Sequence, residues 1–193
     1  MIVYGDSYTS GENNNFVSFA DYLEIEKHGI SGTCLDEYSI YPVFNSGLLS
    51  QLHDYSGTIL LEYGVNDAAS LVTGYVTIET VKVTIAKMCD LLKNADVYFL
   101  MLSADLKDMM LFSKNYAKYL NNEYLKDLYD ITADDFLWCY TRFCEMMQRK
   151  FKTLYMLPEG FKEYDTDGIH PTDKGYRLIA DYLKQQMERL PTR

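Results

Sequence analysis

The chain begins with the sequence MIVYGDSYTSG (residues 1–11), in which an apolar run leads directly into a polar loop flanked by glycines. Residues 2–4 are β-branched or aromatic, so we expect them to form the first strand of a sheet. Ligands of an open parallel sheet bind beyond the carboxyl ends of its strands, so the hydroxyl of Ser7 is expected to face a crevice. Considered alone, the loop is better explained as a polar turn that caps a following helix.

Short β-rich runs alternate with longer segments of helical period along the rest of the chain. This βαβα order is typical of a parallel sheet covered by helices on both faces, which defines the α/β class. We expect strands at residues 2–4, 24–30, 58–63, 97–102 and 153–157, and helices at residues 16–23, 43–53, 78–93, 133–151 and 173–190. No linker or repeat interrupts the order, so residues 1–193 are expected to form one domain.

The segment 104–150 is unusually long for a connection between two strands, and it is rich in aromatic residues. These residues are Phe112, Tyr116, Tyr119, Tyr124, Tyr129, Phe136, Trp138, Tyr140 and Phe143. We expect the segment to be helical. Two interpretations remain open: the segment is a lid that shapes a substrate pocket, or its aromatic side chains simply enter the core.

The composition argues against several classes of partner. The formal net charge is −10 at pH 7, and such a surface repels nucleic acid phosphates and anionic membranes. We therefore expect a small, neutral molecule as partner, with no nucleic acid and no membrane. Cys34, Cys89, Cys139 and Cys144 show neither the spacing of a zinc site nor that of a disulfide framework.

The beginning of the chain bears on its location. The polar loop begins at residue 5, which leaves no room before it for the basic and apolar regions of a secretory leader. No apolar run reaches the roughly 18 residues that a membrane-spanning helix requires. We therefore expect a cytoplasmic protein, unless a leader has been removed. The sequence carries no signal of the oligomeric state.

The sequence DGIHP (residues 167–171) precedes the last predicted helix and holds a carboxylate and an imidazole three positions apart. Nucleophilic catalysis by serine requires a base that removes the hydroxyl proton and an anion that orients this base. Asp167 and His170 can supply both from a single turn. Gly168 permits the turn, and Pro171 favours an extended backbone at His170. The alternative is a histidine at a helix entry that merely bonds a nearby carboxylate.

Two further motifs follow predicted strands. GVND (residues 64–67) comes after a buried apolar run and places the amide of Asn66 at the same edge of the sheet as Ser7. GISGT (residues 29–33) could supply the backbone N–H of Gly32 to the same region. An acyl-transfer site needs such donors where negative charge develops on oxygen. Each motif also suits an ordinary turn, in which Asn and Gly are common.

The motifs GDS, ISGT, GVND and DGIHP, in this order along the chain, resemble the sequence blocks of the SGNH (GDSL-like) hydrolase family. The resemblance implies a flavodoxin-like three-layer α/β/α sandwich with a five-stranded parallel sheet, and it requires no metal and no cofactor. It assigns roles to five residues: the nucleophile Ser7, its partners Asp167 and His170, and an oxyanion hole made by Ser7, Gly32 and Asn66. Tyr8 departs from the family pattern, which has leucine after the serine.

The motifs and the resemblance together predict a serine esterase that cleaves a carboxylic ester or thioester through an acyl-enzyme. The acyl and leaving groups stay open, because an acetylated sugar, a short-chain lipid ester and a thioester all fit. Two other functions are considered. A flavin- or phosphate-binding flavodoxin-like module is possible because a Ser- and Gly-rich loop after the first strand also cradles phosphates. The other is a catalytically silent relative that binds carbohydrate.

Overall fold

The structure is a computed structural model that describes residues 1–39, 41–43, 52–121 and 130–190. Its centre is a sheet of five parallel strands in the order β2-β1-β3-β4-β5. The strands are β1 (Ile2–Gly5), β2 (Glu26–Gly29), β3 (Thr58–Glu62), β4 (Asp96–Met101) and β5 (Lys152–Tyr155). Each strand overlaps a predicted one, and the predicted parallel arrangement is confirmed.

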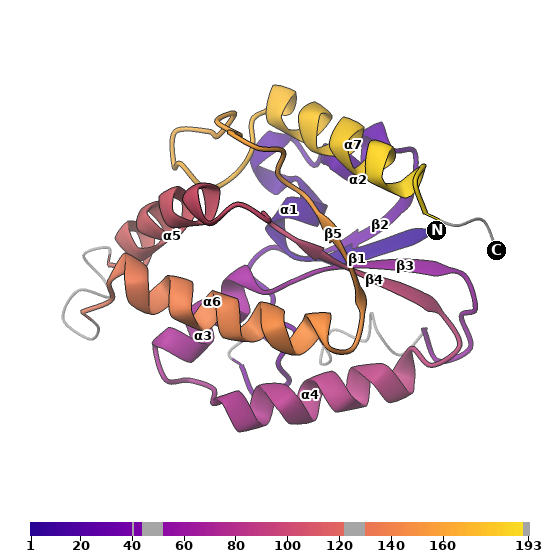
Figure 1. Cartoon of the computed structure of the whole chain (residues 1–193), viewed down its shortest axis with the longest axis horizontal. Helices are drawn as coiled ribbons and strands as arrows, with labels where there is room; N and C mark the ends of the chain where they lie inside the picture. The colour runs from indigo at the N-terminus through magenta and orange to yellow at the C-terminus, as the bar shows by residue number, and fades with distance from the viewer. Residues whose placement is uncertain (40, 44–51, 122–129, 191–193) are drawn as a thin grey trace.

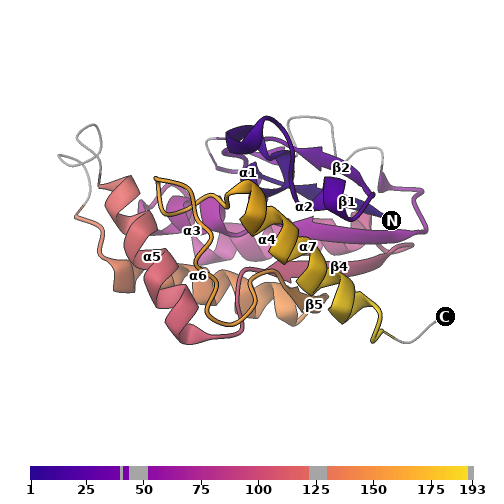
Figure 2. The same cartoon turned by 90° about the horizontal axis from the view of Figure 1, so that it is seen from above.

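Helices cover both faces of this sheet. They are α1 (Ser7–Ser10), α2 (Phe19–Tyr22), α3 (Val65–Val72), α4 (Ile78–Leu91), α5 (Leu106–Leu120), α6 (Ala133–Gln148) and α7 (Asp173–Met187), with a 3-10 turn at Glu12–Asn14. Helices α2 and α7 pack together on one face (Figure 1). Helices α3, α4 and α6 cover the other face, and α5 packs against α6 (Figure 2). The predicted three-layer α/β/α fold is therefore confirmed.

The central strands are buried from both sides, as expected for a parallel sheet between two helical layers. In β3, the side chains of Ile59, Leu60 and Leu61 are completely buried. Full burial of one such side chain contributes about 1.5–3 kcal/mol, so this part of the sheet is strongly fixed. Strand β1 lies beside β3 in a register that pairs Gly5 with Glu62. The carboxyl ends of the two strands therefore lie side by side.

The functional edge of the sheet is set by the position of β1. Strand β2 lies on one side of β1, and β3, β4 and β5 follow on the other side. Ligands of such sheets bind at the point where the strand order changes direction. The segments that directly follow β1, β2 and β3 meet at this point, and they carry Ser7, Gly32 and Asn66.

Two predicted elements begin two or three residues before the observed ones. The predicted helix 16–23 shortens to α2, because Phe16 has a left-handed backbone (φ 63°) and Ser18 caps the helix. The predicted strand 24–30 shortens to β2, because Glu24 is also left-handed (φ 56°). The pattern of apolar residues does not report such backbone angles, which are uncommon for residues other than glycine.

Helix α3 has no counterpart among the predicted elements. It follows Gly64, whose φ of 129° lies in a region that side chains disfavour, so the glycine allows the chain to turn directly from β3 into the helix. The predicted helix 43–53 lies largely outside the described residues, with only its two ends inside them.

The segment 104–150 forms two helices, α5 and α6, that pack against each other. Their buried aromatic side chains are Phe112, Tyr116, Phe136, Tyr140 and Phe143. Tyr124 and Tyr129 lie outside the described residues. Much of the segment therefore stabilises the core, while Tyr116 and Tyr119 also line the cleft described below. Across the described ranges, no helix combines the length and apolar character needed to cross a bilayer.

Candidate active site

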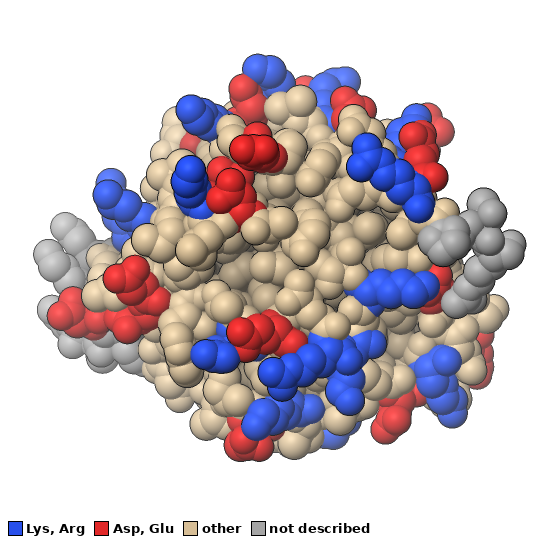
Figure 3. All heavy atoms as spheres, in the orientation of Figure 1, with Lys and Arg blue, Asp and Glu red and all other residues tan. Residues whose placement is uncertain are grey.

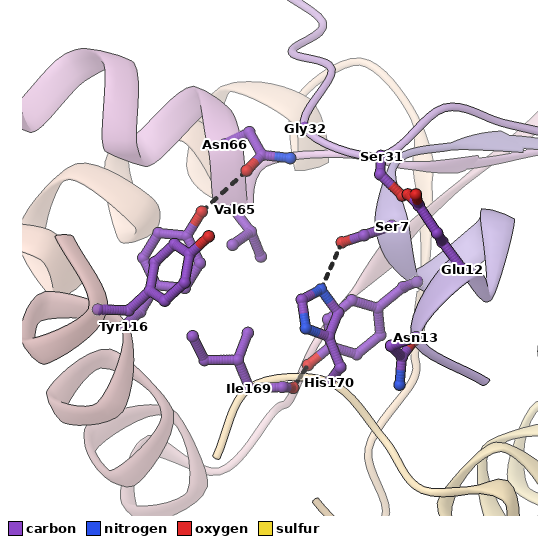
Figure 4. Close-up of a pocket in the computed structure, with 12 residues that line it drawn as sticks. Ser7, Glu12, Asn13, Ser31, Gly32, Val65, Asn66, Tyr116, Ile169 and His170 are labelled. Atoms are coloured by element: carbon purple, nitrogen blue, oxygen red, sulfur yellow. Dashed lines mark hydrogen bonds between the residues drawn. The ribbon is translucent and has the colours of Figure 1, made fainter. Parts of the chain in front are cut away.

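Ser7 lies just after β1, where the chain turns into the short helix α1. Asp6 caps this helix by accepting a hydrogen bond from the backbone N–H of Tyr8 at 3.2 Å. The turn requires Gly5, because a Cβ there would lie 2.7 Å from the carbonyl oxygen of Glu62 and clash with it. This tight turn places the Ser7 side chain in a cleft (Figure 4).

His170 and Asp167 lie in the loop before α7, and the imidazole faces Ser7 across the cleft (Figure 4). The Nε2 atom of His170 lies 2.9 Å from Ser7 Oγ, and its Nδ1 atom lies 2.6 Å from Asp167 Oδ2. The other carboxylate oxygen of Asp167 accepts the backbone N–H groups of Ile169 and His170. Gly168 makes this turn possible with a φ of 70°. One chain of hydrogen bonds thus joins Ser7, His170 and Asp167.

The charge on Asp167 determines how this chain can move a proton. Burial opposes ionisation of Asp167, yet the hydrogen bonds from His170 and the backbone outweigh it and lower the pKa of this carboxyl. An ionised carboxylate next to Nδ1 keeps a proton on that nitrogen and leaves Nε2 as an acceptor for the Ser7 hydroxyl. Asp165 is engaged elsewhere, because its side chain accepts the backbone N–H of Thr166 at 2.7 Å.

Tyr8 packs behind the pair formed by Ser7 and His170. Its side chain is 1% exposed, and its ring centroid lies 6.0 Å from that of the imidazole. The Tyr8 hydroxyl donates a hydrogen bond to the carbonyl oxygen of Ile169 at 2.5 Å. The tyrosine found where the family pattern has leucine therefore connects the nucleophile turn directly to the histidine loop.

Two backbone N–H groups at the cleft are free to bind a ligand. Within the described part of the chain, the N–H groups of Ser7 and Gly32 have no hydrogen-bond acceptor. Gly32 has a φ of 76°, which favours glycine, and a Cβ at this position would meet open space. Backbone donors fixed in this way are suited to an oxygen that becomes negatively charged during a reaction.

The third expected donor, the amide of Asn66, lines the same cleft but is already engaged. Its Nδ2 atom donates to Asp6 Oδ2 at 2.9 Å and to the carbonyl oxygen of Thr33 at 3.2 Å. Its Oδ1 atom accepts the Tyr116 hydroxyl at 2.8 Å (Figure 4). To bind a substrate oxygen, Nδ2 must exchange one of its two bonds, and the longer bond to Thr33 is the weaker one.

Two buried carboxyl groups support the turn that carries Ser7. The side chains of Asp6 and Glu62 are each 1% exposed, and Glu62 Oε2 accepts Asp6 N at 3.1 Å and Thr9 Oγ1 at 3.0 Å. Burial raises the pKa of Asp6 to about 6. Burial, together with the neighbouring Asp6 carboxylate, raises the pKa of Glu62 well above its ordinary value. Burial therefore opposes a second negative charge in this pair, and Glu62 is the member whose ionisation is opposed more strongly.

The cleft has a volume of about 480 Å³ and two different ends. Glu12, Asn13 and Ser31 line one end (Figure 4), and the aromatic residues Tyr116 and Tyr119 line the other. Among the described residues, the Glu12 carboxylate has no hydrogen-bond or ion-pair partner. No group of three or more His, Cys, Asp or Glu side chains within the described ranges is placed to hold a metal ion.

Sequence reasoning missed two residues of this site. Glu62 ends the apolar run of β3, and a carboxyl group in such a run was the available signal that it has a special role. Tyr116 is one of many aromatic residues in the segment 104–150, and no local pattern distinguishes it from the others. Its contact with Asn66 joins residues 50 positions apart and becomes visible only in the fold.

Several solved structures share this architecture. TesA matches with a TM-score of 0.63 at 15% identity over 97% of each chain. The psychrotrophic esterase EstA from a Pseudoalteromonas species matches with a TM-score of 0.58 at 16% identity, over 97% of this chain and 96% of that one. A candidate GDSL-like lipase from Parabacteroides merdae matches with a TM-score of 0.56 at 19% identity, over 97% of this chain and 94% of that one.

No protein-family model and no curated protein sequence matches the chain. At identities of 15%, 16% and 19%, the structural similarity establishes the fold. The chain has the three-layer fold of the SGNH (GDSL-like) hydrolases, as its four sequence motifs predict.

Proposed function

We propose that the chain is a serine hydrolase that cleaves a carboxylic ester or thioester of a small molecule, with Ser7 as the nucleophile. The observation that carries this proposal is the chain of hydrogen bonds from Ser7 through His170 to Asp167, with distances of 2.9 and 2.6 Å, at the wall of a cleft. The fold that the chain shares with an esterase and a candidate GDSL-like lipase supports the same class of reaction.

In the first half of the reaction, Ser7 Oγ attacks the carbonyl carbon of the ester while its proton passes to His170 Nε2. Asp167 stabilises the imidazolium that forms. The electron pair of the carbonyl bond moves onto oxygen and then returns, which breaks the bond to the leaving alcohol. The alcohol oxygen takes the proton from His170 and departs, and the acyl group remains on Ser7 as an ester.

In the second half, water replaces the alcohol. His170 removes a proton from the water molecule, which attacks the acyl carbon and forms a second tetrahedral intermediate. The intermediate collapses, the bond to Ser7 Oγ breaks, and His170 returns its proton to the serine. The acid product leaves, and the site is restored for another cycle.

The oxyanion of both intermediates is stabilised by three donors: Ser7 N–H, Gly32 N–H and the Asn66 amide. The two backbone groups are ready to donate, whereas Asn66 must give up its bond to the Thr33 carbonyl. Tyr116 holds the Asn66 oxygen during this exchange, so the amide nitrogen stays at the cleft. Loss of one such donor typically lowers turnover by roughly 10²–10³-fold.

The charge of the molecule favours a neutral substrate. The net charge is −10, and the Glu12 carboxylate lies in the cleft itself, so an anionic substrate meets repulsion. In Figure 3, acidic and basic side chains lie around a central area of uncharged residues on the face shown. These features support a neutral ester and argue against a phosphate-bearing ligand.

The direct test is hydrolysis of p-nitrophenyl acetate by the wild-type chain and by Ser7→Ala. The wild type should turn over the ester, and Ser7→Ala should lose the activity by a factor on the order of 10⁴ or more while keeping its circular dichroism spectrum. Yellow protein with bound flavin and no hydrolysis would favour the flavin-binding module. Binding of sugar without turnover would favour the silent relative.

A further inference from the structure

A second hollow of about 230 Å³ lies next to the cleft. It shares Gly32, Asn66 and Tyr116 with the cleft, but neither Ser7 nor His170 lines it. The hollow therefore begins at the groups that bind the oxyanion in the proposed function and extends away from the imidazole. It lies where one of the two substituents of the reacting carbonyl has to be placed.

The lining of this hollow is apolar in effect. Ala69, Tyr75 and Leu120 contribute carbon surface. The hydroxyl of Thr73 also lines it, but that hydroxyl donates to the Ala69 carbonyl at 2.7 Å. The hydroxyl of Ser70 is engaged with the thiol of Cys34 at 3.4 Å. The hydroxyls of Thr73 and Ser70 are thus already paired within the protein, and an apolar group loses little by entering the hollow.

The end of the cleft that carries Glu12, Asn13 and Ser31 differs from the hollow in chemistry. The Glu12 carboxylate can accept hydrogen bonds from a ligand, because it has no partner among the described residues. In Figure 4, Ser7 and His170 lie between this end and Tyr116.

The reaction itself decides which substituent goes where. His170 gives its proton to the leaving oxygen, so the alcohol must lie on the imidazole side of Ser7. The acyl group is attached to the same carbon and has to leave the imidazole side. The hollow begins at the oxyanion donors Gly32 and Asn66 and lies on the side away from the imidazole. It therefore offers the acyl group an apolar surface there.

We propose that this hollow is the acyl-binding subsite and that it takes the apolar chain of a short or medium acyl group. The polar end of the cleft then takes a hydroxyl-bearing alcohol. The assignment rests on the proposed function, since it uses the direction of proton transfer from His170. It predicts that the preferred substrate carries a lipid-like acyl chain and not a simple acetyl group.

Ala69 offers the sharpest test, because it is a small, half-buried side chain of α3 in the wall of the hollow. Three proteins are compared on p-nitrophenyl acetate, butyrate and hexanoate: the wild type, Ala69→Val and Ala69→Phe. In the wild type, kcat/KM should rise along this series by about two- to fourfold per methylene buried. Ala69→Val should reduce this rise, and Ala69→Phe should lower the ratio of hexanoate to acetate by about tenfold or more.

The matched control is Ala104→Phe, which adds the same side chain at an exposed alanine away from the cleft. It should leave the ratio at the wild-type value. A second series of esters combines one acyl group with alcohols of increasing length. The order of their kcat/KM values in Ala69→Phe should be the same as in the wild type. Thermal melting shows whether each variant is folded, and the milder valine variant keeps the test valid if the phenylalanine variant does not fold.

The outcomes separate the two proposals. If the wild type hydrolyses none of the esters, the proposed function fails. If the wild type is active but the Ala69 variants keep its chain-length ratio, the acyl subsite is wrong while the esterase remains. If Ala69→Phe changes the ranking of the alcohols instead, the hollow binds the leaving group, and our assignment is overturned.

Discussion

Ser7 and His170 share one hydrogen bond, yet the two residues are held by different kinds of structure. The turn that carries Ser7 rests on contacts between distant parts of the chain, such as that of Thr9 with Glu62, 53 positions apart. The imidazole of His170 is oriented by Asp167, which lies three positions earlier, although distant residues such as Tyr8 also bond its loop. The turn of the nucleophile is fixed by the sheet, whereas the ring of the base is oriented by a carboxylate of its own loop.

Burial follows the same division. The buried pair Asp6 and Glu62 is 1% exposed at each residue, whereas the side chains of His170 and Asp167 are 23% and 34% exposed. A substitution in the buried pair should therefore alter the position of the nucleophile and the stability of the fold together. A substitution in the exposed pair should alter proton transfer and leave stability nearly unchanged.

The largest effect is expected from Asp167→Asn. The amide neither stabilises the imidazolium nor holds the imidazole tautomer, so kcat/KM should fall by up to about 10⁴-fold. Initial rates on p-nitrophenyl acetate measure this change, and thermal melting should show little loss of stability.

Asp165→Asn is the matched control, because Asp165 lies in the same loop but bonds the backbone of Thr166. It should keep the wild-type rate. If Asp167→Asn kept most of the wild-type rate, Asp167 would not be the carboxylate that orients the base, and the comparison between the two pairs would fail.

A smaller effect is expected at Glu62. Glu62→Leu leaves the N–H of Asp6 and the hydroxyl of Thr9 without their acceptor, so the melting temperature should fall. Displacement of the turn should lower kcat by roughly 10²-fold. Glu62→Gln keeps a neutral hydrogen-bonding group of the same shape, so its rate should stay within about threefold of the wild type.

The pH dependence of stability gives a second readout for Glu62. The pKa of Glu62 is higher in the folded protein than in the unfolded chain. Its contribution to the stability of the fold is therefore fully present below the ordinary glutamate pKa, and it is lost as the pH rises through the pKa of the folded protein. Glu62→Gln cannot ionise and does not lose this contribution. As the pH rises, the melting temperature of the variant should therefore increase relative to that of the wild type. If Glu62→Gln and Glu62→Leu lost rate and melting temperature equally, Glu62 would have to support the turn in its ionised form.

The smallest effect is expected from Tyr116→Phe, which removes the hydrogen bond to Asn66 Oδ1. A bond of this kind contributes about 0.5–1.5 kcal/mol, so kcat should fall by about three- to tenfold with KM nearly unchanged. Tyr119→Phe, at an exposed neighbour in the same wall, serves as the control. In an Asn66→Ala background, Tyr116→Phe should have no further effect, and an additive loss would show that Tyr116 acts by another route.

The parts of the molecule that depend on short stretches of sequence could be predicted. The strand before Ser7 is a short apolar run, and the pairing of Asp167 with His170 needs only one turn with Gly168 at its centre. The order of strands and helices follows from hydrophobic periodicity in the same way. The three-layer fold and the five parallel strands were therefore accessible from the sequence.

The parts that depend on backbone angles or on distant contacts could not be predicted. Phe16 and Glu24 adopt left-handed angles that their residue types do not announce. The raised pKa of Glu62 arises from burial beside Asp6, which requires the two strands to be placed side by side. The engagement of Asn66 by Tyr116 likewise depends on the docking of α5, and no local motif encodes it.

The central claim is that His170 activates Ser7 as a nucleophile, and covalent labelling tests it most directly. The wild-type chain is treated with a fluorophosphonate ester, and the modified peptide is mapped by mass spectrometry, with His170→Ala as the comparison. We predict one adduct, on Ser7, that forms rapidly in the wild type and at a rate lower by several orders of magnitude in His170→Ala. An adduct on a different serine, or equal labelling of Ser7 with and without the imidazole, would contradict the account.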